Sequence, residues 1–249
     1  MKLTILGSGT CIPNSKRGSS GYLLETPKSK ILLDCGSGTT WKLEKIGIDY
    51  LAIDHIFFSH LHPDHTGDLV PFLFATKYSH IKKREKPLFL WGGKGFNNFF
   101  KALKKAYGNW IVPVGLNFDE LKGGSDHFQD FKITATKTRH IESSLAYKIE
   151  AEGKSIVYSG DTDYSESLIN LSVNTELLII ECALPNELAK ISGHLTPGEV
   201  IKTINESKPK KVVVTHLYSE CDEENVIETI RSNVDAEVLE AQDLLEVSI

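Results

Sequence analysis

The chain has 249 residues, enough for one large domain or two small ones, and its hydrophobic content of 41% and charged content of 24% are those of an ordinary globular protein. Its formal net charge is −5, and no run of 18 or more apolar residues occurs, which excludes a membrane-spanning helix. The cysteines form no Cys-x-x-Cys pair, which argues against a zinc knuckle or a disulfide framework and favours separate free thiols at Cys11, Cys35, Cys182 and Cys221.

The first half of the chain alternates short apolar runs with turns. The opening run, "KLTILGSG", is interrupted by Gly7 and Gly9 and lacks the long apolar core and cleavage site of a signal peptide, so we expect a first strand and a cytoplasmic protein. Further strands are predicted over residues 21–26, 28–36 and 55–60, and helices over residues 38–47, 68–80 and 95–108.

The second half repeats this order of strands followed by helices. Strands are predicted over residues 131–138, 145–153, 154–161, 177–183 and 210–217, with a hairpin-like pair over 236–249. Helices are predicted over residues 196–207 and 222–232, the first with Thr196 as N-cap, Pro197 in its first turn and Glu199 three residues after the cap. This order predicts an α+β protein in which two sheets pack face to face with helices outside, a four-layer αββα sandwich that forms a single domain over residues 1–249.

A dense group of ligand-type side chains follows the predicted strand 55–60. Within "HLHPDH", residues 60–65, stand His60, His62, Asp64 and His65. Neutral imidazole and carboxylate are ligands that suit zinc, manganese and iron. Clustered histidines repel each other when protonated and gain nothing structural without a metal, so the turn predicts a metal site.

Three more candidates stand where predicted strands end, namely His140, Asp161 and His216. Because strand ends of one sheet can converge on one edge, we expect all of these side chains to meet there. Five histidines and two aspartates are enough for two ions, with His60, His62 and His140 at the first, Asp64, His65 and His216 at the second, and Asp161 as a bridge. The remaining histidines His55, His80 and His127 are expected to be surface or otherwise satisfied side chains.

The run His60-x-His62-x-Asp64-His65 resembles the H-x-H-x-D-H signature of the metallo-β-lactamase superfamily. The resemblance extends along the chain through "ILGSGT", "LLDCG", "SGDT" and "VVTH", and implies the αββα fold and a dinuclear metal site. Histidine rather than glutamate at position 62 argues against the di-iron branch that reduces oxygen or nitric oxide. Aspartate rather than cysteine at position 161 argues against true β-lactamases.

Two further stretches are similar to ribonuclease Z, "HIESSLAYKI" at residues 140–149 and "SGHLT" at residues 192–196. By this resemblance His194 would contact the phosphate and act as general acid, while Ser143 or Ser144 would donate a hydrogen bond to the phosphate. The stretches depart from that family at Ala146, where it has glycine, and at Leu195, where it has serine.

A larger departure concerns the long Gly/Pro-rich arm with which ribonuclease Z grips tRNA. Only 20 residues separate His140 from Asp161, and two predicted strands fill them, so no room remains for the arm. The chain therefore resembles a ribonuclease Z-like hydrolase that lacks the usual tRNA handle.

The predicted function is that of a phosphodiesterase, in which a hydroxide held by two divalent metal ions attacks a phosphodiester. Zinc is the expected metal, with manganese or iron as alternatives. Asp64 would orient the nucleophile or take its proton, and His194 would protonate the leaving oxygen. The expected substrate is a small or cyclic nucleotide, no membrane partner is expected, and the resemblance favours a homodimer.

Other functions remain open. The first alternative is a ribonuclease Z-type endoribonuclease that processes tRNA 3′ ends and binds RNA through residues 77–105, where nine basic residues stand against one acidic residue, a net charge of +8. A thioester or lactone hydrolase is the second alternative, and it would have no need of His194. A non-catalytic nucleic-acid-binding module is disfavoured, because such a module has no use for seven metal ligands.

Overall fold

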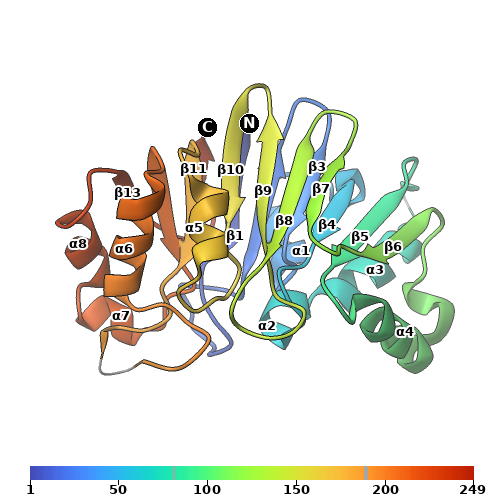
Figure 1. Cartoon of the computed structure of the whole chain (residues 1–249). Coiled ribbons are helices and arrows are strands. Elements are labelled where there is room, and N and C mark those ends of the chain that lie inside the picture. Colours follow the sequence, from blue (N-terminus) through green and yellow to red (C-terminus); the bar gives the residue numbers. More distant parts are fainter. Residues whose placement is uncertain (81, 188–189) are drawn as a thin grey trace.

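The computed structural model describes residues 1–80, 82–187 and 190–249. Within these residues the strands form two seven-stranded sheets (Figure 1). The first sheet has the strand order β14 (Glu246–Ser248), β1 (Lys2–Gly7), β2 (Gly21–Glu25), β3 (Lys30–Leu33), β4 (His55–Phe57), β5 (Leu88–Gly92) and β6 (Leu116–Glu120). The second has the order β13 (Glu237–Glu240), β12 (Lys211–Thr215), β11 (Leu177–Glu181), β10 (Lys154–Tyr158), β9 (Leu145–Ala151), β8 (Lys132–Lys137) and β7 (Gly124–His127).

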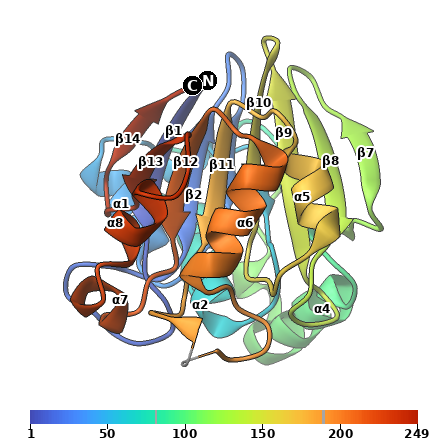
Figure 2. The same ribbon diagram turned by 60° about the vertical axis from the view of Figure 1, so that its left-hand side comes forward.

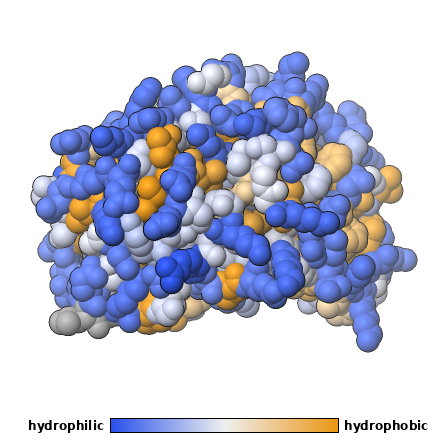
Figure 3. Space-filling model, viewed as in Figure 1, coloured by the Kyte–Doolittle hydropathy of each residue, from blue (hydrophilic) through white to orange (hydrophobic). Residues whose placement is uncertain are grey.

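Helices cover the outer face of each sheet. They are α1 (Thr39–Lys45), α2 (Pro63–Thr66), α3 (Leu69–Tyr78), α4 (Phe96–Tyr107), α5 (Glu166–Ser172), α6 (Pro197–Ser207), α7 (Glu220–Glu223) and α8 (Val226–Arg231), with 3₁₀ turns η1 (Tyr50–Ala52) and η2 (Gly108–Ile111). Figure 2 shows α5 and α6 lying across the second sheet, and Figure 3 shows that this face carries mainly hydrophilic residues with small hydrophobic patches. None of the helices in the described ranges is long and apolar enough to cross a membrane.

Buried apolar residues form three layers that match this architecture. One cluster, which includes Leu3, Tyr22, Ile149 and Ile156, joins the inner faces of the two sheets. A second joins the first sheet to α1, α3 and α4, and a third joins the second sheet to α5, α6 and α8. Two sheets with a shared core and one helical layer on each outer side confirm the predicted αββα sandwich.

The parallel strands decide where the functional side chains meet. Strands β3 to β6 run parallel in the first sheet, and β10 to β13 run parallel in the second. The carboxyl ends of parallel strands lie at one edge of a sheet, so the loops that follow β4, β10 and β12 emerge together. Those loops begin the segments that carry His60, Asp161 and His216.

Two expectations for the C-terminal region were wrong. Residues 236–249 do not form a hairpin, because β13 pairs in parallel with β12 of one sheet while β14 pairs antiparallel with β1 of the other. The connection crosses between the sheets, with Ala241 N donating to Val214 O and Leu244 N donating to Ile5 O. The expected helix 222–232 is divided into α7 and α8 by Asn225, which has a φ of 51°. Strands β5, β6 and β7 and helix α5 were not expected at all.

Candidate metal centre

The turn that follows β4 aims four polar side chains in two directions. His62 has extended backbone angles and precedes α2, which begins at Pro63, so the chain changes from extended to helical between His62 and Asp64. His60 and His65 are fully buried, with exposed fractions of 0%. A buried imidazole must find polar partners, and here those partners come from segments far away in the chain.

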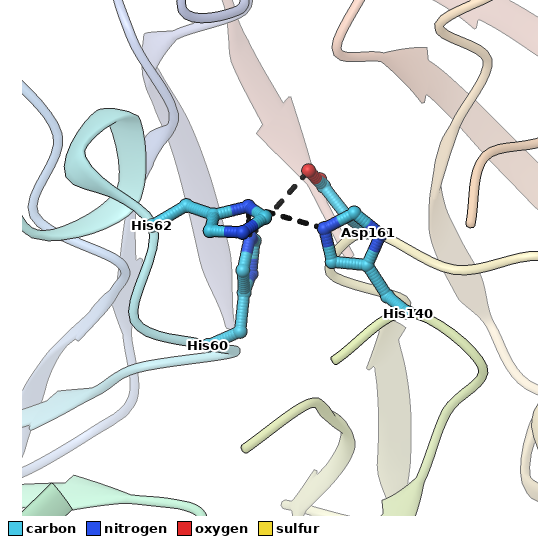
Figure 4. Close-up of side chains that lie close together, drawn as sticks. All are labelled: His60, His62, His140 and Asp161. Atoms are coloured by element: carbon cyan, nitrogen blue, oxygen red, sulfur yellow. Dashed lines mark hydrogen bonds and ion pairs between the residues drawn. The ribbon is translucent and has the colours of Figure 1, made fainter. Parts of the chain in front are cut away.

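The first group of side chains gathers around His62 (Figure 4). Its Nδ1 atom lies 3.0 Å from Nε2 of His60 and 3.1 Å from Nε2 of His140. The carboxylate of Asp161 completes the group, and its ligand-type atoms all lie within 4.8 Å of one another. Three ring nitrogens that point at one another in this way are the donor set of a divalent transition metal.

The second group consists of Asp64, His65 and His216, and Asp161 lies between the two groups. One oxygen of Asp161, Oδ2, is 3.6 Å from Nε2 of His60, 3.4 Å from Nε2 of His65 and 3.3 Å from Nε2 of His216. The seven side chains selected from the sequence therefore do meet, and Asp161 has the position that a bridging ligand would need. Their roles as ligands remain predictions.

In four of these imidazoles Nδ1, the ring nitrogen that faces away from the other ligands, contacts a polar partner. The pairs are His60 Nδ1 with Ser59 Oγ at 3.1 Å, His65 Nδ1 with Asp34 Oδ2 at 2.7 Å, His140 Nδ1 with Gly193 O at 2.8 Å, and His216 Nδ1 with Ser20 Oγ at 3.2 Å. Each contact orients its ring so that Nε2 faces the centre, which is how metal-binding histidines are held in proteins. Asp34 was not predicted in this role, although it stands in the run "LLDCG".

The pKa shifts of several of these groups, and one buried ring nitrogen, are consistent with metal binding. Burial lowers the pKa of His60, His62 and His140, which leaves these rings neutral and able to bind a metal at neutral pH. Burial would raise the pKa of Asp161, but His216 and His65 hold it well below its ordinary value. Nε2 of His65 is buried and makes no hydrogen bond of regular geometry among the described residues, and its polar neighbours are the carboxylates of Asp161 at 3.4 Å and Asp64 at 3.7 Å, which suits an ion between them. The donor set therefore fits two divalent metal ions.

His194 lies beside this cluster and is held by Glu181, which was not predicted as part of the site. Its Nδ1 is 3.1 Å from Oε1 of Glu181, which is only 1% exposed at the end of β11. The ring centroids of His194 and His140 are 4.8 Å apart. Burial alone would lower the pKa of His194, but Glu181 raises it above its ordinary value. A charged residue directly after the apolar run "LLII" was the one sequence signal that could have indicated Glu181.

The two serines differ in their surroundings. Oγ of Ser144 accepts a hydrogen bond from the backbone N–H of Ile141 at 3.1 Å, so this side chain braces the loop after His140. Oγ of Ser143 is buried and unpartnered within the described part of the chain. The hydroxyl of Ser143 is thus unpaired but closed off from solvent, and the substrate-binding role of both residues stays a prediction.

The basic residues of 77–105 do not form one surface. Lys82 pairs with Asp49, and Lys86 with Asp54, at the amino-terminal side of β4 and β5, while Lys94 pairs with Glu142 beyond the carboxyl end of β5. Arg84 donates to the backbone carbonyls of Leu51, Ile53 and Pro87. The local charge is therefore divided between two ends of the sandwich and partly neutralised. Of the remaining histidines, His80 and His127 are exposed as expected, but His55 is buried against aromatic rings.

Comparison with known proteins shows similarity along nearly the whole chain. The profile of the family described as Anti-Pycsar protein Apyc1 matches residues 1–234. A ribonuclease Z of Methanothermobacter thermautotrophicus is 25% identical over 301 residues, which cover 100% of this chain and 97% of that protein. The probable metallo-hydrolase YhfI of Bacillus subtilis is 29% identical over 220 residues, which cover 87% of each protein.

Solved structures give the same picture of the fold. The metallo-β-lactamase fold protein YhfI from Bacillus subtilis superposes with a TM-score of 0.88 at 26% identity, over 99% of this chain and 98% of the other. The short form of human tRNase Z superposes with a TM-score of 0.80 at 24% identity, over 100% of this chain and 99% of the other.

Proposed function

We propose that this chain, which belongs to the protein family described as Anti-Pycsar protein Apyc1, is a phosphodiesterase that hydrolyses small or cyclic nucleotide diesters. The chain is a metallo-hydrolase with the metallo-β-lactamase fold and is related to ribonuclease Z. Our proposal concerns the substrate, the roles of individual residues, zinc as the native metal with manganese or iron as alternatives, and the organisation of residues 1–249 as one domain. The family description names an action against Pycsar, which we extend to this chain as part of the proposal.

The observation that carries this proposal is the pairing of the ligand cluster with the His194–Glu181 contact. Six potential ligands surround Asp161, which is the seventh, and a ring nitrogen of His194 lies within 4.8 Å of ligand-type atoms of Asp161 and His216. A phosphodiester needs both charge neutralisation at phosphorus and a proton for the departing oxygen, and this arrangement offers a group for each task. Glu181 raises the pKa of His194, so this imidazole holds its proton to a higher pH than an ordinary histidine and can serve as the donor.

In the proposed reaction Asp64 accepts one proton and His194 donates another. Two divalent ions, when bound by the seven ligands, would lower the pKa of a water molecule and neutralise charge on phosphate oxygens. Asp64 orients the water and takes its proton while the water oxygen forms the new bond to phosphorus. As the bond between phosphorus and the leaving oxygen breaks, His194 gives a proton to that oxygen, and Glu181 keeps its ring in place.

The surroundings of the cluster favour a small substrate. Strands β9 and β10 form a tight hairpin in which Ala151 pairs with Lys154, so the segment between His140 and Asp161 is taken up by the sheet. No arm extends from this segment, all of which lies in the described ranges. Without such a handle, affinity must come from contacts close to the metal centre, and these suit a mononucleotide better than a folded RNA.

A ribonuclease Z-type reaction on tRNA 3′ ends is the second candidate, and the names of several relatives favour it. The division of the basic residues of 77–105 between two ends of the molecule speaks against a continuous RNA-binding surface. A thioester or lactone hydrolase is a third candidate, but it would have no use for the proton that His194 holds. A homodimer remains part of the proposal on the strength of the family resemblance alone.

One experiment separates these candidates. Metal-loaded protein is incubated with cyclic mononucleotides, with a chromogenic phosphodiester and with a precursor tRNA extended at its 3′ end, and the Asp64→Ala variant serves as control. Turnover of the small diesters alone, lost in the variant, is the expected result. Clean cleavage at the tRNA 3′ junction, with a rate that falls steeply as salt is added, would replace the proposal by the ribonuclease reading. If the wild-type protein cleaves none of the three substrates, the phosphodiesterase reading fails and the ester hydrolases become the leading candidates.

A further inference from the structure

A cavity of about 540 Å³ opens at the end of the sandwich opposite the candidate metal centre. It lies where β4 and β5 begin, whereas the candidate metal ligands follow the end of β4 (Figure 1). It is lined by His55 of β4, by Phe89 and Trp91 of β5, and by Phe128 in the turn between β7 and β8, whose ring packs edge-on against the rings of His55 and Trp91. None of these residues has a role in the reaction proposed above.

The aromatic walls offer faces for a flat ligand. The rings of Phe89 and Trp91 lie nearly parallel, 6.1 Å apart with an angle of 10° between their planes, and Phe128 meets Trp91 edge-on at 5.6 Å and 69°. All three side chains are half-buried rather than buried, so part of each ring borders the cavity. Half-buried aromatic rings that surround a hollow are typical of ligand sites, because a stacked ring removes apolar surface from water on both sides.

His55 adds a hydrogen-bond donor to this wall. The indole N–H of Trp91 donates to Nδ1 of His55 at 3.2 Å, and an indole nitrogen can only donate, so Nδ1 is the acceptor. Burial lowers the pKa of His55 to about 4, which keeps the ring neutral at pH 7 and leaves its proton on Nε2. Within the described ranges this N–H has no hydrogen-bond partner, so it is available to an acceptor atom in the cavity.

Two exposed lysines stand on the rim of the cavity. Lys86, which is 69% exposed, lies 3.7 Å from Asp54, while the amine of Lys28 has no carboxylate within ion-pairing distance among the described residues. Two carboxylates lie near them, because Asp54 accepts a hydrogen bond from the backbone N–H of Lys30 at 2.9 Å and Asp130 accepts one from the backbone N–H of Lys28 at 2.7 Å. The unpaired amine of Lys28 remains available to an anionic group at the mouth of the aromatic cavity.

From this combination we infer that the cavity binds a mononucleotide. The base lies against Trp91, Phe89 and Phe128 and accepts a hydrogen bond from Nε2 of His55, while the phosphate lies at Lys28 and Lys86. The site is separate from the metal centre, so the nucleotide is a ligand there and undergoes no reaction. This inference does not depend on which substrate the metal centre hydrolyses.

Tryptophan fluorescence can report on this site directly. The chain has three tryptophans, and Trp41 and Trp110 are 78% and 62% exposed, so a protein with Trp41→Phe and Trp110→Phe keeps Trp91 as its single reporter. The His62→Ala substitution is added to remove a candidate metal ligand, and the protein is titrated with the four 5′-mononucleotides and with ribose 5-phosphate. We expect a saturable change of Trp91 emission with at least one nucleotide and no change with ribose 5-phosphate.

The lysines supply a variant that should not disturb folding, since both side chains are exposed. In the same background, Lys28→Gln with Lys86→Gln should weaken nucleotide binding by about fivefold or more and leave binding of the uncharged nucleoside unchanged. The inference is overturned if no nucleotide gives a saturable change, if ribose 5-phosphate gives the same response, or if the lysine pair has no effect. It is equally overturned if the response requires an intact His62, because the nucleotide then lies at the metal centre. Hydrolysis of diesters by the wild-type protein is a separate readout, so the failure of either hypothesis leaves the other testable.

Discussion

Asp34 and His65 form a fully buried contact, in which Nδ1 of the histidine donates to Oδ2 of the aspartate at 2.7 Å. The same carboxylate accepts from the backbone N–H of Ser59 at 2.6 Å, from the hydroxyl of Ser59 at 2.7 Å and from the hydroxyl of Tyr158 at 2.5 Å. Asp34 itself has a φ of 60°, a left-handed conformation that is unusual for aspartate. A strained and fully buried carboxylate with four donors holds His65 in one orientation, which a metal ligand requires.

The first prediction concerns this contact. Asp34→Asn replaces one of the accepting oxygens with a donor, so the ring of His65 loses its fixed orientation, and metal affinity should fall by about 10- to 100-fold. Competition with a chromogenic chelator measures the affinity. Asp130→Asn is the matched control, because Asp130 also accepts from three donors, in Thr26, Lys28 and Ser29, but contacts none of the candidate ligands. If both variants bind metal like the wild type, Asp34 has only a structural role.

The second prediction separates metal binding from proton transfer. Asp161→Ala removes the carboxylate that lies between the two ligand groups, and the protein should lose metal. His194→Ala should keep its metal and lose about 10²- to 10⁴-fold in turnover, which is the range of general acid catalysis. Elemental analysis together with turnover of a nucleotide diester tests the pair. Equal metal loss in the two variants would contradict this division of roles.

The third prediction addresses Glu181 as a positioning residue for His194. In Glu181→Gln the contact with Nδ1 loses its charge, so the pKa of His194 falls and a smaller fraction of the protein carries the proton to be donated. Hydrolysis of a nucleotide diester, whose departing oxygen needs a proton, should slow strongly, whereas a 4-nitrophenyl diester should be affected little because 4-nitrophenolate leaves without protonation. A variant that slows both substrates equally would point to a general structural defect instead.

The fourth prediction concerns stability and pH. Arg17 donates to both carboxylate oxygens of Asp222 at 2.8 and 2.7 Å, which ties the loop after β1 to α7 and lowers the pKa of Asp222 below its ordinary value. A lowered pKa in the folded state means that this contribution is complete above the unfolded-state pKa of about 4 and is lost as the pH falls through the folded-state value. Half of the Asp222 side chain is exposed and solvent screens the ion pair, so Asp222→Asn should lower the free energy of unfolding by only about 0.5 kcal/mol at pH 7.

Denaturant unfolding at several pH values from neutral to acidic checks this prediction. The difference between wild type and Asp222→Asn should be constant at neutral pH and shrink below about pH 4, where the wild-type carboxyl also becomes neutral. Lys202→Gln is a control for an exposed surface cation, since the Lys202 amine lies 4.0 Å from Glu206 and 4.3 Å from the ring centroid of Tyr164 and contacts no carboxylate of Asp222. A difference that grows toward acidic pH would mean that Arg17 and Asp222 do not stabilise the fold as proposed.

Much of the fold followed from local patterns. Short β-branched runs marked most strands of the sandwich, and the capping box was predicted correctly, with Thr196 accepting from the backbone N–H of Glu199. Strands β6 and β7 escaped prediction because their residues are largely polar and exposed, so they have no apolar alternation to reveal them. The C-terminal pair was assigned to one hairpin because two neighbouring runs of strand-forming residues normally pair with each other.

Part of the candidate site could likewise be predicted from the sequence, and part could not. His60, His62, Asp64 and His65 could be selected from their spacing alone, because a single turn brings them together. Glu181 and Asp34 were not selected, since an acidic residue at the end of an apolar strand marks an unusual position but carries no local sign of its partner. The aromatic cavity was also invisible, because His55, Trp91 and Phe128 come from three segments that meet only when the sheets pack.

Local patterns in the sequence were enough to predict a turn rich in imidazole and carboxylate, further residues of these types at strand ends, and two layers of strands. The packed fold was needed to show which groups hold the candidate ligands in place, how the basic residues are distributed, and that β13 and β14 belong to different sheets. This division arises from the distance along the chain between contacting residues. Spacing along the chain records contacts within a few residues, whereas the pairs Asp34–His65, Glu181–His194 and Trp91–His55 form only when packing of the whole fold brings distant segments together.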